Sequence, residues 1–314
     1  MTRLLIVLGL WLAMVASPAA AQKRIALTFD DVPRSAGAFL SVEERARRLI
    51  AALDAAGVEQ AAFFVNPGAL ADAHGAGGEA RIAAYVAAGH VIANHGDRHL
   101  ALRRTDADAY LADIDRAEAW LRPRAGHRPW FRFPFLDEGQ GDKAKRDAVR
   151  AGLARRGLTN GYVTAESSDW HIESLAIRAR AAGKAIDMAA LRDLYVESHV
   201  GAAEFADTLM VQATGRRVAQ VMLLHETDLA ALFVGDLVAA LKAGGWTIVT
   251  ADAAYADPVA VEAAQVDVPS AQGTLTEALA WARGLPAPRW YARNDTRLLD
   301  RLFAERVLHE GSGK

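Results

Sequence analysis

The chain has 314 residues, of which 52% are hydrophobic and 24% are charged, and this composition excludes an intrinsically disordered protein. Its 36 Lys and Arg residues nearly balance its 38 Asp and Glu residues, so the net charge of −2 gives no electrostatic basis for binding DNA or RNA. The absence of Cys excludes disulfides, zinc fingers, iron–sulfur clusters and cysteine nucleophiles, and it restricts metal ligands to His, Asp and Glu.

Residues 1–21 are predicted to be a signal peptide. Arg3 supplies a short positive region, residues 4–16 are apolar, and three Ala residues precede Gln22. The alternative is an uncleaved anchor, but 13 apolar residues are fewer than the roughly 20 that a membrane-spanning helix needs. We therefore expect a periplasmic or secreted protein that has no stable membrane span after cleavage.

Short β-rich runs alternate with helical stretches along the rest of the chain. Strands are predicted at 24–29, 61–65, 90–93, 129–133, 158–163, 218–224 and 246–250. Helices are predicted between them at 41–56, 78–88, 106–122, 143–156 and 228–243. This alternation indicates βαβ units with parallel pairing, and the nearly all-apolar strands suit a sheet that is buried on both faces.

Chemically reactive side chains follow these strands. They are Asp30 and Asp31 after the first, His95 and His99 after the third, Arg132 at the end of the fourth, Asp169 after the fifth and His225 after the sixth. In an α/β barrel all these points lie on the face that carries the active site. Their placement favours a barrel over a doubly wound sheet and indicates an enzyme.

Two of these histidines are spaced as metal ligands. A helical turn would place His95 and His99 on one side, and Asp31 could add a carboxylate oxygen. Two His and one carboxylate leave a position for water, which is typical of hydrolytic divalent metal sites. Consecutive residues of an extended chain point in opposite directions, so Asp30 becomes a candidate base beside that water. The alternatives are two capping or packing histidines and an ordinary turn after the strand.

Five short motifs occur in register along the chain. They are Thr28-Phe29-Asp30-Asp31, His95-x-x-x-His99, Arg132-Phe133-Pro134-Phe135, Asp169-Trp170 and Leu223-Leu224-His225. In this order they resemble the five motifs of the polysaccharide deacetylases of the NodB-homology type, a family of carbohydrate esterases. The resemblance implies a distorted (β/α)7 barrel and a metal-dependent hydrolase that removes acetyl groups from N-acetylated or O-acetylated sugars. It does not cover the region after about Pro258.

The resemblance also implies a role for each motif residue. It assigns Asp31, His95 and His99 to the metal and Asp30 to the general base. The ligand types favour Zn²⁺, with Co²⁺ or Ni²⁺ as alternatives. The expected partner is therefore an acetylated carbohydrate, which is bound beside a divalent cation.

The remaining motif residues would serve the base, the acid and the substrate. Arg132 would keep Asp30 ionised and oriented through a charge-assisted hydrogen bond. His225 would be the general acid that protonates the leaving group, with Asp169 raising the pKa of its imidazole. The residues expected to line the substrate site are Trp170, Leu223 and Phe135.

Two positions depart from the family pattern. The second motif usually carries Ser or Thr directly after its first His, where this chain has Gly96, so the rigidity of the loop or its metal affinity comes into question. The fourth motif often opens with Asp three residues before the Asp-Trp pair. Here Glu166 stands at that position, which preserves the charge on a longer side chain.

We expect a barrel at 22–256, with a helical insertion between strands five and six, and a helical extension at 257–314 that packs on it. The insertion at 171–220, which includes a predicted helix at 187–195, is expected to fold over the barrel mouth and narrow the cleft; a peripheral helical layer is the alternative. Helices are predicted in the extension at 275–283 and 296–308. Its aromatic residues either pack the extension on the barrel or stack on sugars, and they are Trp281, Trp290 and Tyr291.

The expected activity is that of an exported, metal-dependent deacetylase acting on a carbohydrate. One alternative is a metal-dependent amidohydrolase or esterase that acts on a small acylated molecule. Another is a non-catalytic relative that binds the cell wall. Asp30, Arg132 and His225 argue against the second alternative, because binding alone requires no base, no residue to hold it and no acid.

Overall fold

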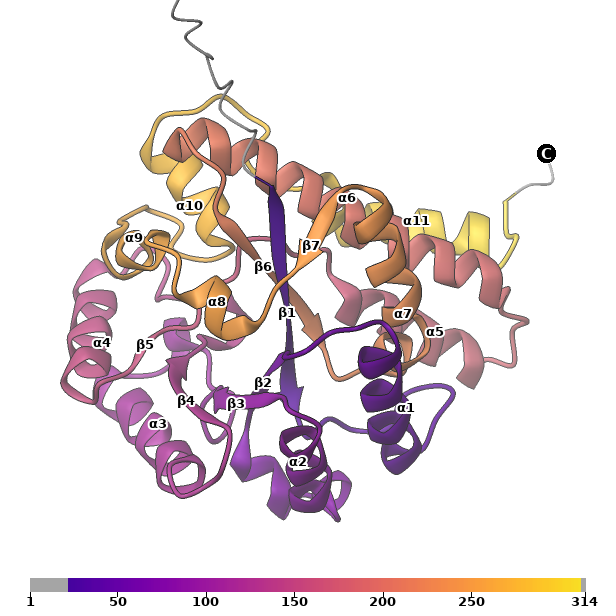
Figure 1. Ribbon diagram of the computed structural model, residues 1–314, viewed down its shortest axis with the longest axis horizontal. Coiled ribbons are helices and arrows are strands. Elements are labelled where there is room, and N and C mark those ends of the chain that lie inside the picture. Colours follow the sequence, from indigo (N-terminus) through magenta and orange to yellow (C-terminus); the bar gives the residue numbers. More distant parts are fainter. Residues whose placement is uncertain (1–21, 312–314) are drawn as a thin grey trace, which may run out of the picture.

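The computed structural model describes residues 22–311, and its centre is a curled sheet of parallel strands (Figure 1). The strands pair in the order β5-β4-β3-β2-β1-β6, and β7 also pairs with β1. Their bounds are β1 (Lys23–Val32), β2 (Ala62–Val65), β3 (Val91–Asn94), β4 (His127–Phe131), β5 (Thr159–Asn160), β6 (Ala219–His225) and β7 (Trp246–Ile248). The predicted fold class, a distorted α/β barrel with extra helices, is confirmed.

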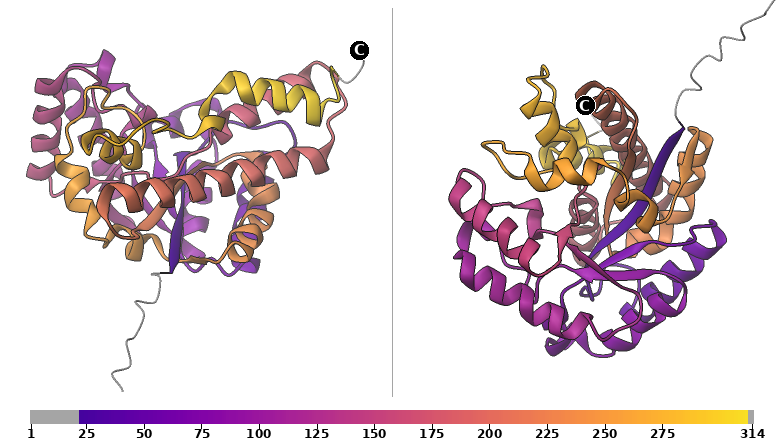
Figure 2. Two further views of the ribbon diagram at one scale, coloured as in Figure 1. Left: turned by 90° about the horizontal axis from the view of Figure 1, so that it is seen from above. Right: turned by 60° about the vertical axis from the view of Figure 1, so that its left-hand side comes forward.

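Helices surround this sheet, and α1 to α4 follow one another around its outside (Figures 1 and 2). In chain order they are α1 (Val42–Ala55), α2 (Gly78–Ala87), α3 (Ala107–Leu121), α4 (Lys143–Arg155), α5 (Asp169–Ala181), α6 (Met188–Thr214), α7 (Asp228–Ala243), α8 (Ala251–Tyr255), α9 (Val259–Gln265), α10 (Leu275–Ala282) and α11 (Thr296–Leu302). A π-helical turn at Phe303–Val307 continues α11 and contacts α6. No helix within residues 22–311 is long and apolar enough to cross a membrane.

Strand β1 lies at the centre and uses both of its edges. One edge pairs with β6 from Arg24 to Asp30, while the other pairs with β7 at its start and with β2 at its end. Residues 25–30 are all buried, which explains the nearly continuous apolar run of this strand. The register places Asp30 opposite His225, so the ends of β1 and β6 bring these two residues to the same edge of the sheet.

The barrel closes between the segment after β5 and strand β6, where a few hydrogen bonds replace a full β-ladder. Strand β5 has only two residues, and the chain after it turns toward β6, where Ala165 forms an isolated parallel bridge with Met222. The hydroxyl of Thr164 accepts a hydrogen bond from the backbone N–H of Val221 at 2.7 Å and thus replaces a ladder bond. The predicted strand at 158–163 was too long, because β5 ends at Asn160 and the carbonyl of Val163 accepts a hydrogen bond from the N–H of Leu275 at 2.7 Å instead of pairing with β4.

The insertion forms a layer of helices beside the barrel. Helix α6 has 27 residues, so the predicted helix at 187–195 covered only its first third. It packs on α7 and α10. Gly201 lies within α6 where a Cβ atom would come within 2.1 Å of the hydroxyl of Tyr291, so the absence of a side chain lets the extension pack on this helix.

Three predictions from the sequence are not tested by the fold. The predicted signal peptide lies outside the described residues. The division of the chain between residues 256 and 257, and the export that the signal peptide implies, also remain predictions.

Candidate metal site and catalytic residues

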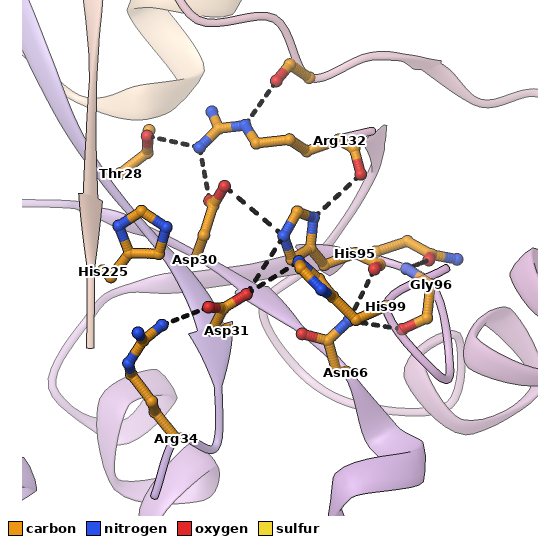
Figure 3. Close-up of polar contacts among 12 residues, drawn as sticks. Thr28, Asp30, Asp31, Arg34, Asn66, His95, Gly96, His99, Arg132 and His225 are labelled. Carbon is orange, nitrogen blue, oxygen red and sulfur yellow. Dashed lines mark hydrogen bonds and ion pairs between the residues drawn. The ribbon is translucent and has the colours of Figure 1, made fainter. Parts of the chain in front are cut away.

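The ends of β1 and β3 bring Asp31, His95 and His99 together (Figure 3). Oδ1 of Asp31 lies 3.1 Å from Nε2 of His99 and 3.5 Å from Nε2 of His95. The three candidate ligand atoms all lie within 4.8 Å of one another. This Oδ1 is buried and accepts no hydrogen bond, so one carboxylate oxygen and two imidazole nitrogens converge on a point that suits a divalent cation.

The protonation state of His95 also fits a cation. Nδ1 of His95 lies 3.0 Å from the backbone carbonyl oxygen of Arg132, which can only accept a hydrogen bond. Nδ1 therefore carries the proton, and Nε2 presents its lone pair to the site.

Backbone strain accompanies the site. Asp31 has φ of 63° and His99 has φ of 52°, although side chains other than Gly rarely occupy this left-handed region. Such conformations cost on the order of 1–3 kcal/mol each, and they persist where the surrounding structure holds them in place for function. The unfavourable backbone conformations of Asp31 and His99, which the fold maintains, thus set the directions of both ligand side chains.

Amide side chains hold the loop that carries the two histidines. The Asn66 amide donates to the carbonyls of His95 and Gly96 at 2.6 and 2.9 Å, and the N–H of Gly96 donates to Asn94 at 2.7 Å. A Cβ atom at Gly96, whose φ is 75°, would lie 2.9 Å from a carboxylate oxygen of Asp113. These hydrogen bonds hold the loop although Gly96 lacks the hydroxyl of the Ser or Thr that the family usually has at this position. Gly96 is therefore compatible with a rigid loop.

Arg132 holds Asp30 in a fixed orientation beside the metal site. The Arg132 side chain is only 1% exposed, and its Nη1 donates to Oδ1 of Asp30 at 2.6 Å and to the hydroxyl of Thr28 at 2.8 Å. Its Nε donates to the carbonyl of Gly161 at 2.7 Å, and its Nη2 donates to the hydroxyl of Tyr255 at 2.6 Å. The other carboxylate oxygen of Asp30 lies 3.6 Å from Nε2 of His95 and faces the site.

His225 forms an ion pair with Asp169. Its Nδ1 lies 2.7 Å from Oδ1 of Asp169, and its backbone N–H donates to Oδ2 at 2.8 Å. Burial lowers the pKa of His225, but the charge of Asp169 outweighs it, so the pKa of this imidazole is raised. Figure 3 shows His225 on the other side of the two aspartates from His95 and His99.

Glu166 lies near the pair of His225 and Asp169, but its carboxylate forms hydrogen bonds with Ser168. Its carboxylate accepts hydrogen bonds from the N–H of Ser168 at 2.6 Å and from the Ser168 hydroxyl at 3.1 Å. Burial raises the pKa of Glu166, and the charge of Asp169 adds to this effect. The longer side chain at this position therefore fixes the turn that precedes α5.

One cavity of about 490 Å³ is lined by the three candidate metal ligands and by Asp30, Glu166 and His225, whereas Arg132 and Asp169 are not among its lining residues. Phe135, Trp170 and Leu223 line it as well, where the sequence analysis had placed the substrate. The C-terminal extension also contributes to the lining, with Gln272, Gly273, Glu277 and Asn294. No residue at 171–220 lines the cavity, so the prediction that the insertion narrows the cleft was wrong. The insertion packs instead on α7 and α10, and the extension narrows the cleft.

The sequence analysis missed two further residues. Arg34 forms an ion pair with Oδ2 of Asp31, and its own N–H donates to Glu226 at 2.8 Å. Its place three residues after Asp31, within the same loop, could have identified it. Tyr255 accepts from Arg132 and donates to the carbonyl of Tyr162 at 3.1 Å, but no spacing in the sequence links it to the motifs.

Residues 17–155 match the family model described as polysaccharide deacetylase. The resemblance to the polysaccharide deacetylase family is confirmed. The matched segment includes Asp30, Asp31, His95, His99 and Arg132 and ends before the last two motifs. No curated protein sequence matches the chain at a significant level.

Several solved structures of carbohydrate esterase family 4 resemble this fold. One is a family 4 carbohydrate esterase from Streptomyces lividans in complex with acetate, which is 19% identical, with 75% of this chain and 97% of that chain covered at a TM-score of 0.48. Another is a family 4 acetyl xylan esterase from Clostridium thermocellum in complex with a cobalt ion, 20% identical, with 74% and 90% covered at a TM-score of 0.48.

A third similar structure is a family 4 pseudoenzyme from Bacillus anthracis, 14% identical, with 73% of this chain and 63% of that chain covered at a TM-score of 0.47.

Proposed function

We propose that the protein is an exported, metal-dependent deacetylase that hydrolyses N-acetyl or O-acetyl groups of a carbohydrate. The observation that carries this proposal is the arrangement of three ligand atoms, a fixed carboxylate and a carboxylate-paired imidazole around one cavity. In the reaction, water adds to the acetyl carbon, and the bond from that carbon to the nitrogen or oxygen of the sugar breaks. The products are acetate and a sugar whose amine or hydroxyl group has taken up a proton. The match to the polysaccharide deacetylase family supports this class of substrate.

Asp31, His95 and His99 would hold the metal ion. Their ligand atoms suit Zn²⁺, and Co²⁺ and Ni²⁺ are the alternatives. When bound, a divalent cation at such a site polarises an acyl oxygen and lowers the pKa of a water molecule. Arg34 pairs with the remaining oxygen of Asp31 and so orients the carboxylate that the site uses.

Asp30 acts as the general base and accepts a proton from the attacking water. Arg132 occupies its Oδ1, which leaves Oδ2 facing the metal site. Because the guanidinium is itself held by Thr28, Gly161 and Tyr255, the carboxylate cannot rotate away from the water. This fixed orientation is the contribution of Arg132 to the reaction.

His225 acts as the general acid and donates its proton to the leaving nitrogen or oxygen. Nδ1 is bound to Asp169, so Nε2 is the nitrogen that remains for this transfer. The raised pKa of His225 keeps more of the imidazole in the protonated form that an acid requires. The acetyl methyl group packs against Leu223 and Trp170, with Phe135 at the rim of the cavity.

Acetate release from a panel of acetylated glycans tests this function. The purified protein is assayed before and after treatment with a chelator, and then after addition of Zn²⁺, Co²⁺ or Ni²⁺. We expect metal-dependent release from at least one glycan and much slower release from small acetamides and acetyl esters. Preference for the small compounds would favour an amidohydrolase or esterase, and no release from any compound would favour a non-catalytic binding protein.

Export is tested separately. The full chain is expressed with its native N-terminus in a Gram-negative host, and periplasm, culture medium and cytoplasm are compared. We expect the mature protein outside the cytoplasm, with Gln22 as its first residue by N-terminal sequencing. An uncleaved protein in the cytoplasm would contradict this part of the proposal.

A further inference from the structure

The two carboxylate oxygens of Asp31 have different surroundings (Figure 3). Oδ1 is buried, accepts no hydrogen bond and lies near the imidazoles of His95 and His99. Oδ2 forms an ion pair with the guanidinium of Arg34, which also lines the cavity. Because this guanidinium occupies Oδ2, only Oδ1 remains directed at the candidate metal site.

The ion pair between Arg34 and Asp31 would be weak if the backbone at Arg34 were free to move. The two side chains are 25% and 24% exposed. Partly exposed ion pairs contribute little on their own, because ordering a long side chain costs conformational entropy. A lasting pair therefore requires that the backbone of Arg34 is held in place.

Two buried charged side chains hold both backbone groups of Arg34. Its N–H donates to Oε2 of Glu226 at 2.8 Å, and its carbonyl accepts from Nη2 of Arg45 at 2.5 Å. Nη1 of Arg45 donates to the next carbonyl, that of Ser35, at 2.7 Å. Arg45 lies in α1, Glu226 directly follows β6, and both residues are fully buried. Two elements of the barrel thus fix the residue that pairs with Asp31.

The segment 34–40 is held at its other end as well. Oδ2 of Asp228 accepts from the N–H groups of Phe39 and Leu40 at 2.7 and 2.9 Å. A Cβ atom at Gly37 would lie 2.5 Å from this same oxygen. The segment therefore lies directly on a buried carboxylate, and a side chain at Gly37 would push it away.

The charges of Arg45 and Glu226 hold this segment more closely than they hold each other. Nη2 of Arg45 lies 3.8 Å from Oε2 of Glu226, and Nη1 lies 3.6 Å from Oδ1 of Asp228, so neither contact is a hydrogen bond. The short hydrogen bonds go to the segment and, from Tyr85, to the other oxygen of Glu226. Burying charges is costly and adds little stability. These charges therefore indicate that the position of the segment matters to the site.

We propose that Glu226 and Arg45 position Arg34, and that Arg34 thereby limits Asp31 to a single metal-binding oxygen. The inference rests on the proposed function, because it takes Asp31 as a metal ligand. Without Arg34, Oδ2 would be free to turn toward the same cation and fill the position that a hydrolytic site leaves for water. Arg34 is thus a positioning residue, because it acts through Asp31.

The visible spectrum of bound Co²⁺ tests this inference without relying on acetate release. The metal-free protein is saturated with Co²⁺, whose visible absorbance weakens as its coordination number rises. The variants are Arg34→Ala, Arg34→Lys, Glu226→Gln, Gly37→Ala and the double variant Arg34→Ala with Glu226→Gln. Acetate release is measured in parallel for each of them.

Two control variants separate positioning from general effects. Arg47→Ala matches Arg34→Ala, because Arg47 forms an ion pair with Glu44 at the same spacing of three residues but lies outside the cavity. Leu53→Ala removes a buried side chain from α1 and lowers stability without touching the segment 34–40. Both controls should match the wild-type spectrum.

We expect Arg34→Ala to lose about half of the Co²⁺ absorbance, as Oδ2 joins the ligands. Its kcat should fall about ten-fold, as is common when a residue that orients a ligand is removed. Arg34→Lys retains a cation and should keep most of the absorbance. Glu226→Gln and Gly37→Ala should show smaller losses of the same kind. In the double variant, Glu226→Gln should add no further loss, because it acts through Arg34.

Other outcomes overturn the inference or separate it from the proposed function. Wild-type absorbance in Arg34→Ala overturns it and leaves the deacetylase intact if acetate is still released. An additive loss in the double variant, or an equal loss in Leu53→Ala, rejects the route through Glu226. If Glu226→Gln does not fold, Gly37→Ala decides whether the segment acts through Arg34.

The expected spectral changes without acetate release from the wild type would support the role of Arg34 and reject the catalytic proposal. If the wild type binds no Co²⁺, both proposals are rejected.

Discussion

Arg132 donates to Asp30 at 2.6 Å, and both side chains are buried. Removing one partner of a buried ion pair is costly, because it leaves the other charge without compensation. Each nitrogen of the Arg132 guanidinium has at least one hydrogen-bond partner, which compensates for the burial of its charge. A carboxylate held in this way beside candidate metal ligands suggests the first test.

Asp30→Asn should abolish most of the activity without removing the metal. The amide cannot accept the proton, and positioned bases contribute about 10²–10⁴-fold to a rate. We expect kcat to fall by that factor, while elemental analysis still finds about one metal ion per chain. A variant with normal kcat would remove Asp30 from the role of base.

Tyr255→Phe should weaken both stability and turnover. The change leaves Nη2 of Arg132 buried without an acceptor, which costs about 1–3 kcal/mol of unfolding free energy. It also loosens the guanidinium that orients Asp30, so kcat should fall while metal affinity stays unchanged. Urea unfolding, steady-state kinetics and metal titration measure the three effects, and unchanged stability and kcat would contradict the account of Tyr255.

His99→Ala should weaken metal binding more than about 100-fold, since even the loss of a hydrogen bond to a ligand costs about 10- to 100-fold. Calorimetric titration of the metal-free protein with Zn²⁺ measures the change. His74→Ala is the matched control, because His74 lines a neighbouring cavity together with Asp31 and His99 but is not itself a candidate ligand. Equal affinities for the two variants would show that the ion binds elsewhere.

The rate should fall at high pH as His225 loses its proton. Its pKa is raised by Asp169, so Asp169→Asn should move this fall to lower pH. The pH dependence of kcat for the two proteins measures the change. Asp300→Asn serves as control, because Asp300 lies 2.8 Å from His171 in a more exposed pair outside the cavity. A profile that does not move in Asp169→Asn would exclude His225 as the acid.

His90 should make the protein less stable in mild acid. Burial lowers the pKa of His90 to about 4, whereas the unfolded chain takes up this proton near pH 6.5. Because the unfolded state binds the proton first, stability falls as the pH drops from about 6.5 to 4, by up to about 3 kcal/mol. Urea unfolding across this range should show a shallower fall for His90→Gln, and parallel curves would contradict the assignment.

Periodic apolar patterns predicted most of the helices and strands to within a few residues. The prediction for β5 was too long because the chain leaves the edge of β4 after Asn160 and Val163 bonds to Leu275 of the extension, which no apolar pattern reveals. The prediction for α6 ended too early. Gly201 is a poor helix former within that helix. A side chain at this position would collide with the Tyr291 hydroxyl, and Tyr291 lies 90 residues later in the sequence.

The residues of the candidate site likewise fall into those that the sequence predicted and those that it did not. Residues at strand ends, such as Asp31 and His95, were placed together correctly because parallel strands end at one edge of the sheet. Tyr255 and Asn294 were not foreseen as parts of the site, since Tyr255 reaches it from the end of α8 and Asn294 from the extension. Their contacts depend on how segments far apart in the sequence pack together, and the spacing of residues along the sequence does not reveal this packing.

Arg132 contacts both halves of the site, with its guanidinium on Asp30 and its backbone carbonyl on His95. Any displacement of the chain just beyond β4 therefore moves the proton acceptor and an imidazole ligand in concert. A single residue thus couples the position of the proton acceptor to the position of a metal ligand.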